Sequence, residues 1–197
     1  MKREFDICPK TIDESKLYGF SWMEHVMANA TMQSWVTFTG EEGYYCIFSS
    51  VNKHGHMYSS IKSTKQCVIN FPSKNEFLKC MRTIDNNGYD NDEIALSGLT
   101  VETASKVNAP KIKECFLNLE CQYIWEKELK PEGNHVVMCV KIINICMDEE
   151  YYNEQKKGRY GNTGYLYNIH SPKNPETGKT EETCVGIIQK YATYDKL

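Results

Sequence analysis

The sequence predicts a mainly β domain in which an antiparallel sheet closes into a barrel, with a few short helices at the ends of the barrel. Four segments are rich in the β-branched, aromatic and cysteine residues that favour strands, and they cover residues 44–51, 66–71, 116–129 and 135–147. Only short helical segments separate these strands, and closure of such a sheet leaves no exposed strand edges. The glycine-rich phosphate-binding motifs of doubly wound and P-loop proteins do not occur, so neither of those fold classes has support.

Length and composition predict one globular domain, residues 1–197, whose last part, residues 151–197, is an extended tail or loop region. The chain is 41% hydrophobic and 25% charged, as ordinary folded proteins are. The net charge is -3 and no basic stripe is present, which argues against nucleic acid as a partner. No apolar run reaches the roughly 20 residues of a membrane span, and none follows the basic residues at the start. We therefore expect a cytoplasmic protein without a membrane partner.

The nine cysteines indicate reduced thiols. Their number is odd, no export signal accompanies them, and no C-x-x-C pair occurs, which argues against a disulfide framework and against a metal site. Cys46 and Cys67 lie in apolar strand segments, where a thiol packs as a small hydrophobe and its pKa rises. We expect these two thiols to be inert.

Polar residues alternate along residues 29–35. If this segment is a strand, Asn29, Thr31 and Gln33 project from one face. Such a row of amide and hydroxyl groups can hydrogen-bond a flat heterocycle or its polyol tail, and the alternative is the solvated face of an antiparallel strand. Trp35 could stack on the ring, but a tryptophan in a strand of a small barrel most often packs in the core, and we expect it there.

The segment 51–73 gathers hydrogen-bond donors between two strands of an acidic chain. We expect a short helix over residues 56–64, with Tyr58 and Ile61 on one face. A strand end followed by a short helix brings together free N–H groups, hydroxyls and cationic side chains, which suit a phosphate dianion. For His56 the alternative is a histidine that meets only solvent. The lysines and histidines of the segment are Lys53, His54, His56, Lys62 and Lys65.

A second helix is expected after Ser73, because Ser73 and Glu76 have the spacing of a capping box. Apolar residues then recur at helical intervals, namely Phe77, Cys80, Met81 and Ile84. Further along, the turn formers of residues 130–134 predict that the last two long strands make a hairpin, 116–147. In its first strand, alternate residues are expected to face the core, namely Leu117, Leu119, Cys121, Tyr123 and Trp125.

The last quarter of the chain offers little regular pattern. Residues 168–182 collect Pro, Gly and charged residues, which predicts one long exposed loop. Tyrosines near this segment could line a substrate mouth or a dimer face, and the dimer face is favoured because tyrosine is enriched at interfaces. They are Tyr151, Tyr152, Tyr160, Tyr165 and Tyr167. No Ser-His-Asp arrangement, pair of catalytic carboxylates or metal cluster has a credible spacing, so we assign no catalytic side chain and no metal ligand.

Five segments occur in a fixed order along the chain: NATMQSW, YYCIFSSVNKHGHMYSSI, CVINFPS, ALSGLTVETASKVNAPKIKECFLNLEC and GNHVVMCVKIINICMDEE. Together they resemble the flavin reductase-like, flavoredoxin-type family of FMN-binding split β-barrels. The resemblance covers roughly residues 20–150, and the fourth segment is its most specific part. It implies a six-stranded antiparallel Greek-key barrel that forms a homodimer and holds FMN near the subunit interface. It also implies NAD(P)H or a redox protein as the electron donor.

The same resemblance implies which residues bind FMN. Residues of the first segment match the strand that lines the flavin, and His56 and its neighbours match residues that contact the phosphate or the ribityl chain. The implied cofactor-binding residues are Asn29, Thr31, Met32, Gln33, Ser34, Ser49, Ser50, Val51, Lys53, His56, Met57, Tyr58 and Asn70. Because the isoalloxazine itself carries the electrons, this function needs no catalytic side chain.

Three features depart from the family pattern. Met57 replaces a common threonine and so removes a hydroxyl. Glu93 stands where a lysine often occurs, and a carboxylate there would repel phosphate if it pointed inward. The first hairpin lacks a turn residue between its halves. Three functions therefore stay open: an FMN-dependent oxidoreductase, an electron-transfer flavoprotein without small-molecule turnover, and a split-barrel binding module that has lost its flavin.

Overall fold

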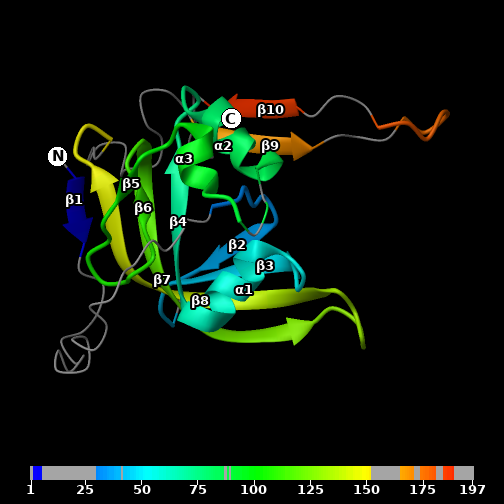
Figure 1. Cartoon of the computed structure of the whole chain (residues 1–197), viewed down its shortest axis with the longest axis horizontal. Helices are drawn as coiled ribbons and strands as arrows, with labels where there is room; N and C mark the ends of the chain where they lie inside the picture. The colour runs from blue at the N-terminus through cyan, green and yellow to red at the C-terminus, as the bar shows by residue number, and fades with distance from the viewer. Residues whose placement is uncertain are drawn as a thin grey trace, which may run out of the picture.

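An antiparallel sheet of six strands forms the body of the protein (Figure 1). The computed structural model describes residues 2–5, 30–40, 42–86, 88, 90–151, 165–170, 174–180 and 184–188. The strands of the sheet are β1 (Lys2–Phe5), β2 (Val36–Thr39), β3 (Tyr45–Asn52), β4 (Gln66–Pro72), β7 (Cys115–Glu128) and β8 (His135–Asp148). Their order is β2-β3-β8-β7-β4, with β1 also beside β8.

Strand β8 organises this sheet. Along one side it forms the predicted hairpin with β7, in register from Leu117 opposite Met147 to Glu128 opposite Val136. Its other side is shared, because β3 pairs with the first half of β8 and β1 pairs with the second half. A strand covered on both edges and both faces needs apolar residues throughout, and β8 is almost continuously buried.

The sheet curls so that its two ends approach each other through side chains. Phe38 of β2 and Phe71 of β4 lie 6.0 Å apart between ring centroids. Inside the curl is a core of buried residues from the strands and from one helix, namely Cys46, Phe48, Val51, Ile61, Leu119, Cys121, Val136, Met138, Val140 and Ile142. The mainly β barrel expected from the sequence is therefore confirmed.

The predicted alternation along β7 holds only in part. The register with β8 shifts between Glu120 and Cys121 and again between Tyr123 and Trp125, and each shift interrupts the period of two. As a result Trp125 is exposed, and the prediction that it faces the core is wrong. Asn118 and Glu120, which alternate with the residues expected to face the core, are fully buried and hydrogen-bonded.

Glu120 explains one long-range connection of β7. Its two carboxylate oxygens accept the backbone N–H groups of Ser105, at 2.9 Å, and Lys106, at 2.6 Å. A buried carboxylate with two such donors is satisfied. The bonds fix the connection after β5 (Val101–Glu102) against the sheet, before the chain continues into β6 (Lys111–Ile112).

In the described ranges, three helices cover the ends of the barrel. Helix α1 (His56–Thr64) has the predicted bounds, and Lys65, in the left-handed conformation at φ 60°, closes it by donating to the carbonyl of Ile61. Helix α2 (Phe77–Asp85) begins after a turn, and Glu76 binds Lys79 at 2.7 Å with no side-chain cap at the helix start. The capping-box prediction is therefore wrong. Helix α3 (Glu93–Ser97) was not predicted, and Asp92 caps it by accepting from the N–H of Ala95.

Two further predictions need correction. Residues 30–35 form no strand, because β2 begins only at Val36. The expected exposed loop at 168–182 holds for residues 175–180, but its first residues belong to β9 (Tyr165–His170), which pairs with β10 (Cys184–Ile188) in a hairpin, with Gly178 at φ 65° between the two strands. Periodicity missed this hairpin because its strands are short and its turn is rich in Pro and Gly. No helix in the described ranges is long and apolar enough to cross a membrane.

Candidate functional site

The start of α1 lies where β3 leaves the sheet. Asn52, the last residue of β3, shapes the turn: its Oδ1 accepts the N–H of His54 and its carbonyl accepts the N–H of Gly55, both at 3.0 Å. Gly55 is the N-cap and offers no side chain to the first turn of α1. The first N–H groups of a helix have no carbonyl of their own helix to bind. Their alignment favours an acceptor or an anion at this end.

The cationic side chains of the segment are already paired, mostly with carboxylates from distant elements. Lys53 binds Glu128 at 2.7 Å, and Lys62 binds Glu126 at 3.0 Å. The Nδ1 of His56 donates to Oε1 of Glu93, also at 3.0 Å. Lys65, at the C-terminal end of the helix, lies over an aromatic ring: its Nζ is 4.6 Å from the ring centroid of Tyr123.

The pKa shifts in this segment agree with the pairing. The hydrogen bond to Glu126 is the main cause that raises the pKa of Lys62. Burial alone would raise the pKa of Glu126, but its hydrogen bonds from Lys62 and Tyr58 outweigh burial and hold that pKa below the ordinary value. The hydrogen bond from Lys53 lowers the pKa of Glu128. Lys62 therefore stays charged, and Glu126 matches its charge within the chain.

Three of the predicted cofactor contacts point into the fold or are engaged there. Val51 is 2% exposed and belongs to the barrel core. Met57 is half-buried and packs against the same core. Tyr58 donates its hydroxyl to Glu126 at 2.9 Å. Val51 can offer a ligand only backbone atoms, because its side chain lies in the core, whereas Met57 keeps part of its side chain at the surface.

Asn70 is also engaged within the fold. Its Oδ1 accepts the N–H of Ile112 at 3.1 Å and the side-chain amide of Asn118 at 2.7 Å, and its own amide donates to the carbonyl of Val68 at 3.2 Å. The side chain thus fastens β6 to β4 and β7. In this chain the side chain of Asn70, the asparagine of the third segment, therefore connects strands by hydrogen bonds.

Polar and aromatic side chains are open to solvent just before β2. Gln33 and Ser34 are exposed, and Thr31 and Met32 are half-buried, Met32 against a second apolar cluster that includes Cys80 and Ile94. Asn29 lies outside the described residues. The alternation predicted for this segment does not hold as a strand pattern, yet the segment still presents amide and hydroxyl groups at the surface.

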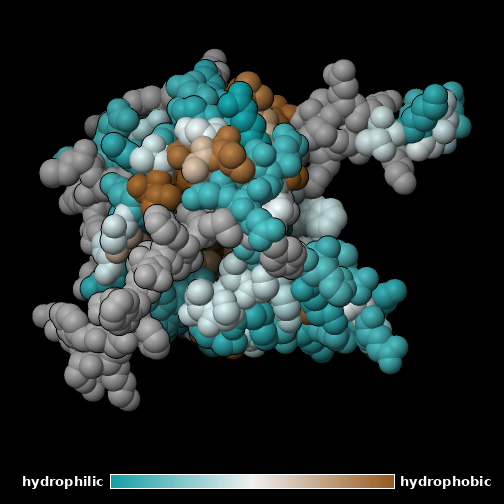
Figure 2. All heavy atoms as spheres, in the orientation of Figure 1, coloured by the Kyte–Doolittle hydropathy of each residue, from teal (hydrophilic) through white to brown (hydrophobic). Residues whose placement is uncertain are grey.

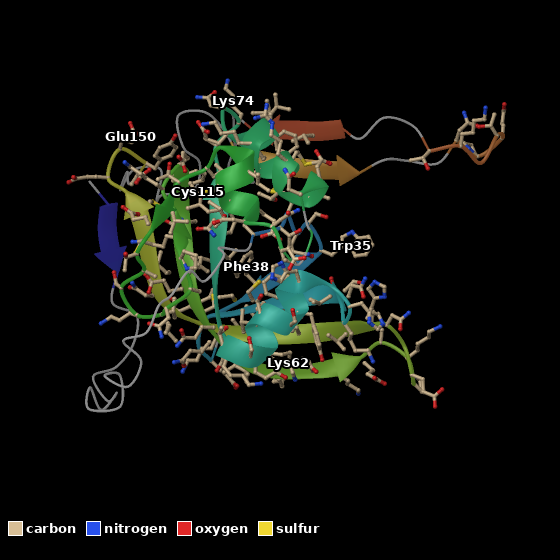
Figure 3. All side chains as sticks on the ribbon, in the orientation of Figure 1. Trp35, Phe38, Lys62, Lys74, Cys115 and Glu150 are labelled. Atoms are coloured by element: carbon tan, nitrogen blue, oxygen red, sulfur yellow. The ribbon has the colours of Figure 1, made fainter. Side chains whose placement is uncertain are left out.

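Trp35 is 56% exposed, so the prediction that it packs in the core is wrong. Figure 3 shows its side chain projecting outward from the ribbon just before β2. Ser49 of β3 fixes this residue, because its N–H and its hydroxyl both donate to the carbonyl of Trp35 at 2.9 Å. An anchored backbone with an exposed indole is an arrangement suited to stacking on a flat ring.

Ser50 borders a small cavity at the turn of the β7–β8 hairpin. The cavity has a volume of about 220 Å³ and is lined by Ser50, Leu129, Lys130, Gly133, Asn134 and His135. The backbone of Lys53 is tied to the same turn, through its N–H to the carbonyl of Asn134 at 2.8 Å. We define the candidate site as residues 31–35, Ser50 and residues 53–58.

The cysteines contribute no reactive thiol to this site. The seven cysteines whose side chains are described form no disulfide with one another. Burial raises the pKa of Cys46 to about 12, in agreement with the prediction of an inert thiol. The hydrogen bond with Cys67, together with burial, raises the pKa of Cys121. In the described part of the chain, no group of His, Cys, Asp and Glu side chains could hold a metal ion.

The fold and the site together define a class: a curled antiparallel barrel with a polar and aromatic edge and an uncapped helix start at its end. Residues 24–167 match the flavin reductase like domain, and the chain belongs to that family. The resemblance inferred from the five segments is thus confirmed.

Known proteins agree with this assignment. An uncharacterized protein of Aquifex aeolicus is 29% identical over 115 residues, which are 54% of this chain and 58% of the relative. The chain spans about half the length of the curated relatives it matches. Among solved structures, flavoredoxin of Methanosarcina acetivorans is 22% identical with a TM-score of 0.62, over 84% of this chain and 80% of that chain. A Shewanella frigidimarina protein described as a flavin reductase with a split barrel domain is 18% identical with a TM-score of 0.64, over 84% and 77%. The fold is therefore the split barrel.

A flavin has a ring, a ribityl chain and, in FMN, a phosphate, and the site suits these parts unequally. Trp35 and the amide and hydroxyl groups of residues 31–34 suit a ring with carbonyls and nitrogens. The cations expected to bind phosphate are neutralised by Glu128, Glu126 and Glu93. Sequence reasoning missed the first two carboxylates because they lie on β7, far along the chain, where no local spacing connects them to α1.

Proposed function

We propose that this protein is a flavin-dependent oxidoreductase that carries FMN and takes electrons from NAD(P)H or from a redox protein. The observation that carries the proposal is the match of residues 24–167 to the flavin reductase like domain, on a chain with the split-barrel fold. A bound flavin supplies the redox chemistry, since its ring accepts and releases electrons singly or as a hydride.

The role of the chain's own residues is then to bind and orient. Trp35 offers an exposed indole face for stacking on the flavin ring. Thr31, Gln33 and Ser34 supply donors and acceptors for ring atoms, and Ser50 lies on the strand that continues toward α1. The first turn of α1 offers backbone N–H groups to the far end of the ligand.

Anaerobic titration of the flavin-loaded protein with NADH or NADPH tests the oxidoreductase proposal. Rapid loss of the visible flavin absorption on addition of one nucleotide alone is the expected result. If the flavin is reduced only when a reduced redox protein is added, the chain is an electron-transfer flavoprotein. Dithionite serves as the control, because it reduces any accessible flavin.

A second candidate function, a split-barrel module without flavin, is favoured by one observation. Glu93 is fully buried beside His56, and a fixed carboxylate opposes a phosphate dianion at that position. A protein that stays colourless after incubation with FMN and with riboflavin would support this candidate.

We also propose that the protein forms a homodimer. Figure 2 shows hydrophobic side chains at the surface near α2 and α3, where Leu78 is 72%, Leu96 56% and Ile84 43% exposed. In Figure 1 the β9–β10 hairpin extends away from the body beside α2. An apolar surface next to a projecting hairpin supports association with a second copy, because monomers rarely expose contiguous apolar patches.

A further inference from the structure

We infer that the candidate site recognises the ring and ribityl chain of a flavin and not its phosphate, so that riboflavin binds as tightly as FMN or more tightly. Glu93 is the residue that sets this preference. The inference rests on the proposed function, namely that the site binds a flavin.

The positive charges near the start of α1 are paired with carboxylates of the same chain. The segment 51–73 carries three lysines. Lys53 is bonded to Glu128 and Lys62 to Glu126. Lys65 lies over the ring of Tyr123. Glu128 and Glu126 neutralise the first two of these charges, and the third, on Lys65, lies at the C-terminal end of α1, opposite the end where the first-turn N–H groups are. A phosphate monoester brings about 1.5 to 2 negative charges at neutral pH and needs unmatched positive charge or several free donors. The described lysines of α1 and of the turn before it provide no such excess.

Glu93 is buried and bonded to His56 at the start of the same helix. This residue is 0% exposed, its Oε1 accepts from His56, and its Oε2 is buried without a hydrogen-bond partner among the described residues. A charged imidazole is neutralised by this carboxylate, and a neutral imidazole leaves the pair with a net negative charge. In neither state does the pair present net positive charge to a phosphate.

Two opposing effects act on an anion at the start of α1. The N–H groups of the first turn attract an anion, but the effect of a helix N-terminus is modest and Glu93 acts at the same end through His56. A buried carboxylate is poorly screened by salt, so its repulsion of a nearby dianion persists at physiological ionic strength. An uncharged hydroxyl, which ends the ribityl chain of riboflavin, is not repelled and can accept from the same N–H groups.

Two flavins that differ only in the phosphate test the inference. Riboflavin and FMN are each titrated into the purified apoprotein, and quenching of flavin fluorescence gives the two dissociation constants. The expected result is a dissociation constant for riboflavin equal to or below that of FMN. An FMN constant tenfold or more below that of riboflavin would overturn the inference without any variant.

The variant Glu93→Gln identifies the residue responsible. Glutamine has nearly the same shape and can still accept from His56, but it removes the negative charge. We expect FMN to bind about tenfold more tightly to the variant and riboflavin to bind unchanged. Glu176→Gln, at the exposed tip of the β9–β10 hairpin, makes the same change in net charge far from the site and should alter neither constant.

The outcomes separate this inference from the proposed function. If neither flavin binds the wild-type protein, the proposed function itself fails. If Glu93→Gln tightens both flavins equally, Glu93 acts on the fold of the pocket and not on the phosphate, and the inference is wrong. If the variant does not fold, the ratio of the FMN and riboflavin dissociation constants of the wild-type protein still decides whether the site recognises the phosphate.

Discussion

At the scale of single residues, the site is defined by what each side chain is already bonded to. Polar residues that sequence patterns mark as ligands are often committed to the fold, as Asn70 is between β4, β6 and β7. The opposite holds for Trp35, which a strand pattern assigns to the core and which the structure leaves 56% exposed. The exposed fraction of a side chain and its bonds within the fold therefore separate candidate ligands from residues that hold the fold together.

Trp35 gives the first prediction. In Trp35→Leu the thermal unfolding midpoint should stay nearly unchanged, because the side chain is largely in solvent. Flavin binding should weaken about tenfold through loss of ring stacking. Melting curves and fluorescence titration check the two parts.

The matched control is Trp125→Leu, which removes another exposed indole, 44% exposed, from β7. Flavin affinity should be unaffected in that variant. Equal weakening in both variants would show that Trp35 has no special contact with the ligand.

At the scale of elements, α1 is held on the barrel by a polar cluster. Glu126 of β7 accepts from Tyr58 at 2.9 Å and from Lys62 at 3.0 Å. The ring of Tyr123 lies beneath the same ammonium, 4.9 Å from Nζ to the centroid. This cluster joins a helix to a strand that follows it by about sixty residues, so local sequence spacing could not predict it.

Removal of the Glu126 charge should loosen α1. We expect Glu126→Gln to lower the free energy of unfolding by about 1 to 2 kcal/mol, because a partly buried ammonium loses its charged partner. The measurement is urea denaturation. Glu128→Gln, which removes a carboxylate that is 46% exposed against 19% for Glu126, is the control and should leave the midpoint nearly in place.

The same cluster predicts a pH dependence. Because the pKa of Glu126 is lowered in the folded state from its ordinary value of 4.5, its contribution is present above that value and is lost as pH falls through the folded-state pKa. Below pH 4.5, Glu126→Gln and wild type should therefore converge in stability. A constant difference down to the acid transition would contradict this role.

How far the sequence predicts the elements depends on how local their signals are. Strands β3, β4, β7 and β8 and helix α1 were predicted within a residue or two, because each has a strong local composition. Helix α3 has only five residues, and one capping residue, Asp92, does not suffice to predict a helix of that length. The pairing of cations with carboxylates depends on register between distant strands and is not predictable from local patterns.

At the scale of the whole molecule, the barrel presents an apolar surface near α2 and α3. We expect light scattering during size-exclusion chromatography to give twice the chain mass of 22.8 kDa. Leu78→Glu, at a side chain that is 72% exposed, should shift the protein toward the monomer without unfolding it. A monomeric wild-type protein would contradict the proposed homodimer.

Our proposals share one premise about the molecule: this split barrel binds a flavin at the edge formed by residues 31–35 and α1. The most direct test is the visible absorption spectrum of the purified protein after incubation with flavin and removal of the excess, followed by identification of what denaturation releases. We expect a flavin band that stays with the protein and a released flavin of unchanged mass. A colourless protein after incubation with both FMN and riboflavin would contradict it.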